Sequence, residues 1–427
     1  MSKKNSILII LFISILIIGG LFYLYFFKNS TDNKAIDTTP TTEFPFGKTS
    51  GGSPDNTSDN NYNNVNNSNN QFGTTKEGEW GGYLKLKQIY QKPTSGTFLK
   101  TKNNQDSVRF VDRATGNIYE YLISDEKSDV SRLTNTTIPK IQESIWFGFG
   151  EKIILRYADN SNNIVSFLGK ISTTSKDSIG EVVGNFLTIN EKQVVVSPDN
   201  TTIFELLDKP NNGGSYGNTY SVATSSNKKQ IFDSPLSIWN ISWPKADIIT
   251  FNTKPTYKDY GYLFFLNTKT YSFERILGEI TGLTTNTNKD ADLVAYSGSL
   301  NGFLGFDIYD VKNREDKNLK IKTLSDKCVW SNYNSKHIYC AVPKNISTGN
   351  YPDDWYQGSV SFNDDFWMID TEEGTTKLIY ENKEDNNLNI DAFDLKLNDT
   401  DKYLAFTNKN DLSLWLLDLK EETPTQQ

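Results

Sequence analysis

The chain has 427 residues with a formal net charge of −8, one histidine and two cysteines. The acidic balance argues against a nucleic-acid-binding protein, which would show a basic face, and so few histidines and cysteines make a His/Cys zinc site implausible. Aromatic residues make up 13% of the chain and lie in many short apolar runs, which indicates an all-β protein.

The first apolar segment, residues 7–27, contains no charged residue. As a helix it would be about 31 Å long, close to the thickness of a bilayer core. A cleaved secretory signal is the alternative, but its apolar region is usually shorter and ends in small residues. We therefore expect residues 1–28 to form an uncleaved signal anchor in the cell membrane. Lys3 and Lys4 precede the span, so its amino end should be cytoplasmic and the rest of the chain extracytoplasmic.

Residues 29–80 are rich in Asn, Ser, Thr and Gly and contain few large apolar side chains. Such a segment cannot bury enough apolar surface to offset the entropy lost on ordering. We expect a disordered linker between the anchor and the domain that follows. Residues 421–427 should form a short tail.

From residue 81 to 420, a pattern of four short β-type runs separated by turn residues returns roughly every 35–55 residues. Its clearest copy consists of residues 328–331, 337–342, 366–370 and 376–379. This repeat predicts a β-propeller with seven four-stranded blades, although six or eight blades would also fit the spacing. The last repeat stops near Leu419 after three strands, so an unassigned run at residues 83–90 should supply its fourth strand and close the ring.

The turn Ser197-Pro198-Asp199-Asn200, which separates two such runs, resembles the Ser-Pro-Asp-Gly turn of TolB-type, WD40-like β-propellers. Residues 369–374 and 397–406 are similar, whereas the Gly-His and Trp-Asp marks of WD40 repeats are absent. An anchor, a tether and one propeller together are similar to membrane-anchored bacterial propeller proteins of undefined role. The resemblance implies the fold and names no activity.

Gly213-Gly214-Ser215-Tyr216-Gly217 matches the G-x-S-x-G pattern of a nucleophile elbow. An elbow needs a strand before it, a helix after it, and an aspartate and a histidine further on. Here a strand-like run follows, and the single histidine, His337, lies in a predicted hairpin of another repeat. We interpret Ser215 as a loop residue and expect no catalytic residue.

Four aspartates in predicted turns could suggest a calcium site: Asp290, Asp292, Asp399 and Asp401. Their spacing does not form an EF-hand loop, and turn aspartates usually bond to nearby backbone groups. We expect no metal site and no cofactor.

Cys328 and Cys340 lie symmetrically about Asn334 in a predicted hairpin. If the strands pair in that register, the two cysteines face each other within reach of a disulfide, and export would provide the oxidising setting. Two buried free thiols are the alternative.

The connection between the second and third strands of the clearest repeat runs from Pro343 to about Asn363. Connections of that length are usually functional or disordered, and this one is too aromatic for disorder. Because all such connections lie on one face of a propeller, we expect a binding face there. It would contain Tyr216, Tyr257, Tyr260, Tyr351, Asp353, Asp354, Trp355 and Tyr356. In the alternative, Trp355 and Tyr356 fold back to cap their own blade.

These features favour a binding module for a protein, peptide or glycan, and an enzyme less. Two alternatives stay open: an extracellular hydrolase with carboxylates at the propeller centre, and a structural component of envelope assembly. Clustered acids at the centre would favour the hydrolase. A broad apolar and aromatic patch on one face would favour binding.

Overall fold

The computed structural model describes residues 85–123, 130–173, 178–188, 190–383 and 388–420. The expected anchor at 1–28, with its span at 7–27, the expected linker at 29–80, residues 81–84 at the start of the expected propeller, and the expected tail at 421–427 lie outside these ranges. Within the ranges, no helix has both the length and the apolar character needed to cross a membrane.

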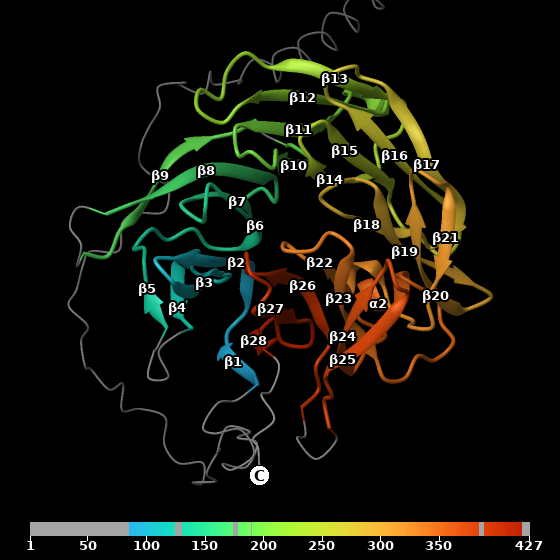
Figure 1. The fold of residues 1–427 in the computed structure, drawn as a ribbon. Helices are drawn as coiled ribbons and strands as arrows, with labels where there is room; N and C mark the ends of the chain where they lie inside the picture. The colour runs from blue at the N-terminus through green and yellow to red at the C-terminus, as the bar shows by residue number, and fades with distance from the viewer. Residues whose placement is uncertain (1–84, 124–129, 174–177, 189, 384–387, 421–427) are drawn as a thin grey trace, which may run out of the picture. The chain divides into compact units, whose positions relative to one another are not determined.

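The described strands form seven four-stranded antiparallel sheets arranged around a common axis (Figure 1). The chain is therefore an all-β protein with the fold of a seven-bladed β-propeller, as the repeat pattern predicts. In each sheet the first strand lies nearest the axis and the fourth lies at the outside.

The first three blades follow one another along the chain. Blade 1 consists of β2 (Thr94–Lys102), β3 (Gln105–Asp112), β4 (Ile118–Leu122) and β5 (Ser131–Arg132). Blade 2 consists of β6 (Ile141–Phe147), β7 (Lys152–Ala158), β8 (Ile164–Ser172) and β9 (Glu181–Phe186). Blade 3 consists of β10 (Gln193–Val196), β11 (Thr202–Asp208), β12 (Ser215–Ser221) and β13 (Lys229–Ser234), with a 3-10 helix η1 (Pro210–Asn212) after β11.

The next three blades have the same order of strands. Blade 4 consists of β14 (Trp239–Lys245), β15 (Ile248–Thr253), β16 (Tyr260–Asn267) and β17 (Phe273–Thr281). Blade 5 consists of β18 (Thr284–Thr287), β19 (Leu293–Leu300), β20 (Phe303–Asp310) and β21 (Glu315–Asn318). Blade 6 follows the 3-10 helix η2 (Ser325–Lys327) and consists of β22 (Cys328–Trp330), β23 (His337–Pro343), β24 (Asp364–Asp370) and β25 (Thr375–Tyr380), with a short helix α2 (Asp353–Tyr356) before β24.

Blade 7 joins the two ends of the propeller. Its first three strands are β26 (Ala392–Leu397), β27 (Tyr403–Asn408) and β28 (Leu414–Asp418), and its outer strand is β1 (Leu86–Tyr90). β1 pairs antiparallel with β28, so that Leu86 lies opposite Leu417. The prediction that the first strand of the domain completes the last blade is confirmed, and this pairing holds the ring closed.

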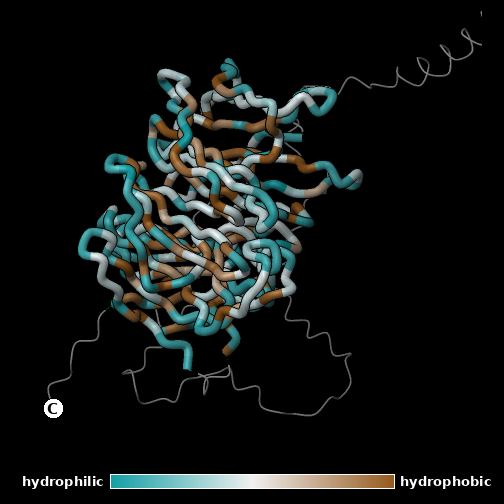
Figure 2. The backbone as a smooth tube through the Cα atoms, turned by 90° about the vertical axis from the view of Figure 1, so that its right-hand side faces the viewer, coloured by the Kyte–Doolittle hydropathy of each residue, from teal (hydrophilic) through white to brown (hydrophobic). Residues whose placement is uncertain are grey.

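The core lies between the blades, which explains why the strands do not alternate strictly between apolar and polar residues. All six residues of β27 are buried, because neighbouring blades cover both faces of such a strand. One apolar cluster joins Val111 and Ile118 of blade 1 to Ile153 and Phe167 of blade 2. Hydrophobic stretches accordingly run through the strands, and hydrophilic residues gather in the turns (Figure 2).

The connections of a propeller divide between two faces. We call the face with the first-to-second and third-to-fourth connections the turn face. The second-to-third connections and the links between blades lie on the other, which we call the strap face. It is named after residues 344–363, the long connection between β23 and β24, which we call the strap.

On the turn face, polar side chains tie neighbouring blades together. The Asp401 carboxylate of blade 7 accepts a hydrogen bond from the backbone N–H of Asn332 in blade 6, at 3.1 Å. Asp292 of blade 5 forms an ion pair with Lys336 of blade 6, at 2.6 Å. These two turn aspartates therefore have structural partners. Among the described residues, no group of three His, Cys, Asp or Glu side chains is arranged to hold a metal ion.

The two cysteines lie directly opposite each other in the β22–β23 pair, in the register that the hairpin symmetry predicts. Their Cα atoms are 4.1 Å apart and their sulfur atoms 2.09 Å apart. Trp330 and Ile338 form the next pair on the same face and share the buried cluster around the sulfurs. This geometry is that of a disulfide within one hairpin.

We expect the full chain, isolated from cells that export it, to contain no free thiol when it is denatured without reductant. Replacing both cysteines with alanine should lower the free energy of unfolding by about 2–3 kcal/mol, since the bond closes a short loop in the unfolded chain. Thiol counting and urea unfolding measure the two effects. Two free thiols per chain would rule out the bond in the native protein.

Candidate functional site

The strap crosses several blades on its face of the propeller. The Asp353 carboxylate, at the start of α2, accepts a hydrogen bond at 2.7 Å from the backbone N–H of Tyr257 in blade 4. The backbone N–H of Gly349 donates to the carbonyl of Gly302 in blade 5, at 3.0 Å. The strap thus reaches two blades that precede its own.

At its other end the strap contacts blade 7. The Ser361 hydroxyl donates to Oδ1 of Asn410 at 2.6 Å, and the backbone N–H of Phe362 donates to the Asp391 carboxylate at 3.1 Å. Four successive blades therefore touch this one connection.

Two of the aromatic residues expected on a binding face lie instead inside the protein. Tyr351 is completely buried, and Trp355 is 3% exposed. Both pack against Leu304 of blade 5, Leu324 and Phe362. Their burial means that neither ring can contact a partner in this arrangement. The alternative, in which Trp355 and Tyr356 fold back, therefore describes Trp355, which also contacts the neighbouring blade, whereas Tyr356 stays 40% exposed.

A buried group of charges lies beneath Trp355. The Lys327 ammonium is 2.5 Å from Oδ1 of Asp391 and 2.8 Å from Oδ2 of Asp364, and all three side chains are fully buried. The indole N–H of Trp355 donates to both oxygens of Asp391 at 3.0 Å. The ammonium groups of Lys327 and Lys409 each lie 5.2 Å from the centre of the Trp355 ring. We call these five residues the charged cluster.

Burial shapes the protonation of the charged cluster. It raises the pKa of Asp364 to about 6, although Lys327 acts in the opposite direction, because a second carboxylate beside one ammonium carries an unbalanced charge in a dry environment. Burial also lowers the pKa of Lys409. Removing one member of a buried ion pair typically costs about 3–5 kcal/mol, since it leaves a bare charge. The charged cluster should therefore hold the strap firmly in one position.

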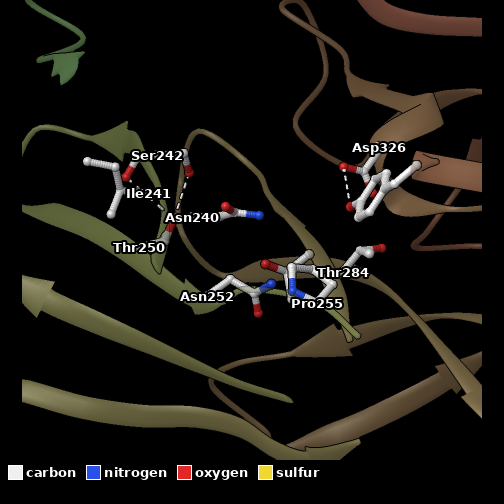
Figure 3. A pocket seen from close by; sticks show the side chains of 10 residues that line it. Asn240, Ile241, Ser242, Thr250, Asn252, Pro255, Thr284 and Asp326 are labelled. Atoms are coloured by element: carbon white, nitrogen blue, oxygen red, sulfur yellow. Dashed lines mark hydrogen bonds between the residues drawn. The ribbon is translucent and has the colours of Figure 1, made fainter. Parts of the chain in front are cut away.

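Next to the charged cluster lies a pocket of about 110 Å³, which we call the axial pocket (Figure 3). It lies between the first strands of blades 4 and 5, η2 and the strap. Its walls are Asn240, Ile241, Ser242, Thr250, Asn252, Pro255, Thr284, Thr285, Asp326 and Tyr356.

Asp326 and Tyr356 form one wall of the axial pocket. The Tyr356 hydroxyl donates to Oδ1 of Asp326 at 3.2 Å. Asp326 is exposed to solvent; the loss of hydration caused by the protein around it raises the pKa of its carboxyl, whereas the hydroxyls of Tyr356 and Thr284 and the charge of Lys327 act in the opposite direction. Among the described residues, no lysine or arginine forms an ion pair with Asp326. The axial pocket therefore contains an accessible carboxylate without a counter-ion.

On the other side of the axial pocket lie polar side chains from blade 4, and the amide nitrogen of Asn240 points from there toward the side of Asp326 (Figure 3). The hydroxyls of Ser242 and Thr250 are hydrogen-bonded to each other at 2.6 Å. The Asn252 amide N–H donates to the carbonyl of Leu283 at 3.0 Å, whereas its Oδ1 is buried without a hydrogen-bond partner. This wall also has a free donor, because the Asn240 side-chain oxygen accepts from Gln193 at 3.4 Å while its amide nitrogen has no hydrogen-bond partner among the described residues.

The strap face also carries exposed apolar side chains, which come from the links and second-to-third connections of blades 3 to 6. They are Leu236, Ile238, Tyr260, Leu300, Phe303 and Tyr356, each between 40% and 73% exposed. Eight other large apolar side chains are exposed elsewhere among the described residues, for example Phe149 and Tyr333 on the turn face.

The remaining residues expected on the binding face lie on the strap face with different degrees of access. Tyr260 is exposed, whereas Tyr216 and Tyr257 are half-buried. Oδ2 of Asp354 accepts the backbone N–H of Asn350 at 2.8 Å, which places this acid in the internal bonding of the strap. Of the eight expected residues, Tyr260 and Tyr356 are thus the most available to a partner.

The interpretation of Ser215 as a loop residue is wrong, because its backbone pairs with Asp208 of β11 and Ser234 of β13. Ser215 begins β12, is fully buried, and donates its hydroxyl to the carbonyl of Leu236 at 2.6 Å. His337 lies in blade 6, with Nε2 at 3.2 Å from Oδ2 of Asp370. The serine and the histidine therefore have separate local partners in different blades.

Sequence reasoning missed the polar walls of the axial pocket. One signal was available, because Thr284–Thr287 is unusually polar for the first strand of a blade and Thr284 lines the pocket. Asp326 carries no such signal, since an aspartate beside a lysine before a strand is typical of any surface link.

We expect Trp355→Ala to lower the free energy of unfolding by about 3–5 kcal/mol, because it removes a buried ring and uncovers Asp391. Tyr356→Ala, the next residue, removes a partly exposed ring with one hydrogen bond and should cost about 1 kcal/mol. Urea unfolding of the full chain, followed by circular dichroism, compares them. Equal and small effects would show that Trp355 does not hold the strap.

No protein-family model matches the chain, and no curated protein matches its sequence. Similar solved structures include TolB from Acinetobacter baumannii, at 13% identity and a TM-score of 0.42 over 63% of this chain; the match spans 62% of the TolB chain, less than two thirds of its length. The β-propeller domain of the Trilobed protease from Pyrococcus furiosus has 9% identity and a TM-score of 0.47, over 78% of this chain and 99% of that one. The Neurospora crassa Pan2 WD40 domain has 8% identity and a TM-score of 0.47, over 78% and 92%. At such identities the likeness concerns the propeller fold and extends no further.

Proposed function

We propose that this propeller is a binding module, displayed outside a membrane, that holds a protein, peptide or glycan partner on its strap face. The observation that supports this proposal best is the axial pocket, where the unpaired carboxylate of Asp326 stays open to solvent. An unpaired charge surrounded by protein costs free energy. A positively charged group from a partner would stabilise this carboxylate. We therefore interpret the pocket as a ligand-binding site.

The composition of the axial pocket favours binding over hydrolysis. Hydrolysis by paired carboxylates needs two acids on either side of the bond that breaks. Asp326 is the one acid among the ten residues that line the pocket. A single carboxylate among amides and hydroxyls suits recognition of a polar group.

The exposed apolar residues of the strap face would supply contact area around the pocket. Recognition surfaces are typically enriched in aromatic residues at the centre of a polar rim. Two exposed aromatic residues could fill this role: Tyr260, which belongs to blade 4, and Tyr356, which belongs to the strap. The proposal therefore assigns orientation to the polar pocket and affinity to the apolar residues.

We expect the double variant Ile238→Ser and Tyr260→Ser to lose most of the partner captured by cross-linking to the full chain in producing cells. Both side chains are well exposed on the strap face, so their removal should change contact area and leave the melting temperature within a few degrees. Mass spectrometry of the cross-linked products measures the loss.

The matched control is Phe149→Ser with Tyr333→Ser. These side chains are at least as exposed but lie in first-to-second connections, on the turn face. Capture should stay at the level of the unmodified chain. If the control pair abolishes capture and the strap-face pair does not, the binding face is wrong.

The membrane part of the proposal depends on residues 7–27, whose length and lack of charge suit a single span. We expect protease added to intact cells to digest the propeller and to leave a small fragment that contains the amino end. Blotting with a tag at the amino terminus follows that fragment. A mature chain that begins after residue 27 would contradict the anchor, and a propeller that is cut only after cell lysis would contradict its external location.

A further inference from the structure

We propose that the axial pocket binds a primary ammonium group, from a lysine side chain or the amino terminus of a partner chain, with Asp326 as its counter-ion. The inference rests on the proposed function and names the chemistry that the pocket selects. Four features of the pocket lead to it: its charge, its free acceptors, its size and the ring of Tyr356.

The charge of the pocket is not balanced from within. Lys327 follows Asp326 directly in the chain, but its ammonium is bound to Asp364 and Asp391 at 2.8 and 2.5 Å. Lys327 is therefore bound to two other carboxylates and acts on Asp326 only through its charge, so that Asp326 has no ion-pair partner among the described residues. A cation that enters the pocket would lose part of its hydration shell, and its attraction to the Asp326 carboxylate would have to offset that cost.

The free hydrogen-bonding capacity matches a donor. An ammonium group has three N–H donors and no acceptor. The axial pocket offers the Asp326 carboxylate and the hydroxyl oxygens of Ser242 and Thr250, which can each accept a further bond, whereas Oδ1 of Asn252 is unpartnered but closed to solvent. An anion would be repelled by the Asp326 carboxylate, and a neutral carbonyl group would leave that charge unpaired.

The size of the pocket selects a single small group. Sites for drug-sized ligands measure roughly 300–1,000 Å³, whereas this pocket is about 110 Å³. One side-chain end fits such a space, and an oligosaccharide does not. The proposal therefore favours a protein or peptide among the partner classes considered above.

Two other cations fit less well. A guanidinium group binds best to both oxygens of a carboxylate, but Oδ1 of Asp326 already accepts the Tyr356 hydroxyl. An ammonium group is a compact point charge that needs one oxygen. A calcium ion takes six to eight oxygen ligands, usually from several carboxylates, and the described residues contain no group of three acidic, histidine or cysteine side chains arranged for a metal.

The Tyr356 ring would contact the methylene groups and the charge of the ligand. It is 40% exposed, and its hydroxyl bond to Asp326 fixes its position at the edge of the pocket. Aromatic rings attract ammonium groups through their negative faces. The carboxylate and the ring thus act on the same cation from neighbouring residues of the wall.

The test is titration of the detergent-solubilised full chain with Nα-acetyl-lysine methylamide, followed by ligand-observed NMR. We expect saturable binding, which is absent for the uncharged analogue Nα-acetyl-norleucine methylamide. Asp326→Asn should weaken binding at least tenfold. A second probe, glycyl-glycine methylamide, presents a terminal amine and shows which of the two sources the pocket prefers.

Asp290→Asn is the matched control, because Asp290 is an exposed aspartate in a turn-face connection and should leave the affinity unchanged. Tyr356→Leu removes the ring and should weaken binding severalfold, while Tyr356→Phe keeps the ring and should weaken it less. Equal binding of the lysine and norleucine probes, or unchanged affinity in Asp326→Asn, would overturn the proposal. So would displacement of the lysine probe by millimolar calcium, or tighter binding of Nα-acetyl-arginine methylamide.

The outcomes separate the two proposals. If neither amine probe binds but the strap-face variants still lose their partner, the ammonium assignment is wrong and the binding face stands. If the amine probes bind and the strap-face variants keep their partner, the pocket stands and the proposed function is wrong.

Discussion

The contact between Lys327 and the carboxylates of Asp364 and Asp391, covered by Trp355, is the interaction on which the strap face depends. It joins the start of blade 6 to the start of blade 7 and fixes the strap above both. Asp326 and Tyr356, which form one wall of the axial pocket, are each adjacent in sequence to a member of the charged cluster. Asp326 precedes Lys327, and Tyr356 follows Trp355. Buried Lys327 and Trp355 thus fix the backbone beside Asp326 and Tyr356. The positions of these two accessible side chains therefore depend on the buried charged cluster.

A buried ionic arrangement of this kind is a poor source of net stability, because desolvation offsets most of the attraction between the charges. Its value lies in geometry. An apolar contact would tolerate small shifts of the strap, whereas Lys327 and Asp391 must meet within hydrogen-bond distance, and the indole N–H of Trp355 must reach the same carboxylate. A similar arrangement lies between blades 2 and 3, where Arg156 bonds the backbone carbonyls of Glu191 and Lys192 at 2.9 Å. Directed polar contacts thus set the position of elements that apolar packing alone would leave adjustable.

The sequence predicts the blades and the cysteine register because each depends on nearby residues, and it predicts the closure, which pairs Leu86 with Leu417, because the last repeat lacks one strand and the first is preceded by an extra one. Strand runs, turn residues and the symmetry about Asn334 are all local patterns. The contacts of the strap, in contrast, join residues that are distant in sequence. Trp355 is hydrogen-bonded to Asp391, 36 residues further on, and Tyr356 to Asp326, 30 residues earlier. The sequence around a tryptophan in a long polar connection does not differ between a ring that faces solvent and a ring that contacts a buried carboxylate. Composition therefore identified the strap as important and could not show which of its rings are exposed.

The reach of the strap also bears on how the propeller opens. In repeat proteins each unit usually contacts its immediate neighbours, and stability adds up pair by pair. Here one connection from blade 6 is bonded to Tyr257 in blade 4, Gly302 in blade 5 and Asn410 in blade 7. Fraying of any of these four blades at the strap face must break bonds that the others share, so their amide hydrogens should exchange with solvent as one cooperative unit. This single connection thus couples the local unfolding of blades 4, 5, 6 and 7 into one cooperative transition.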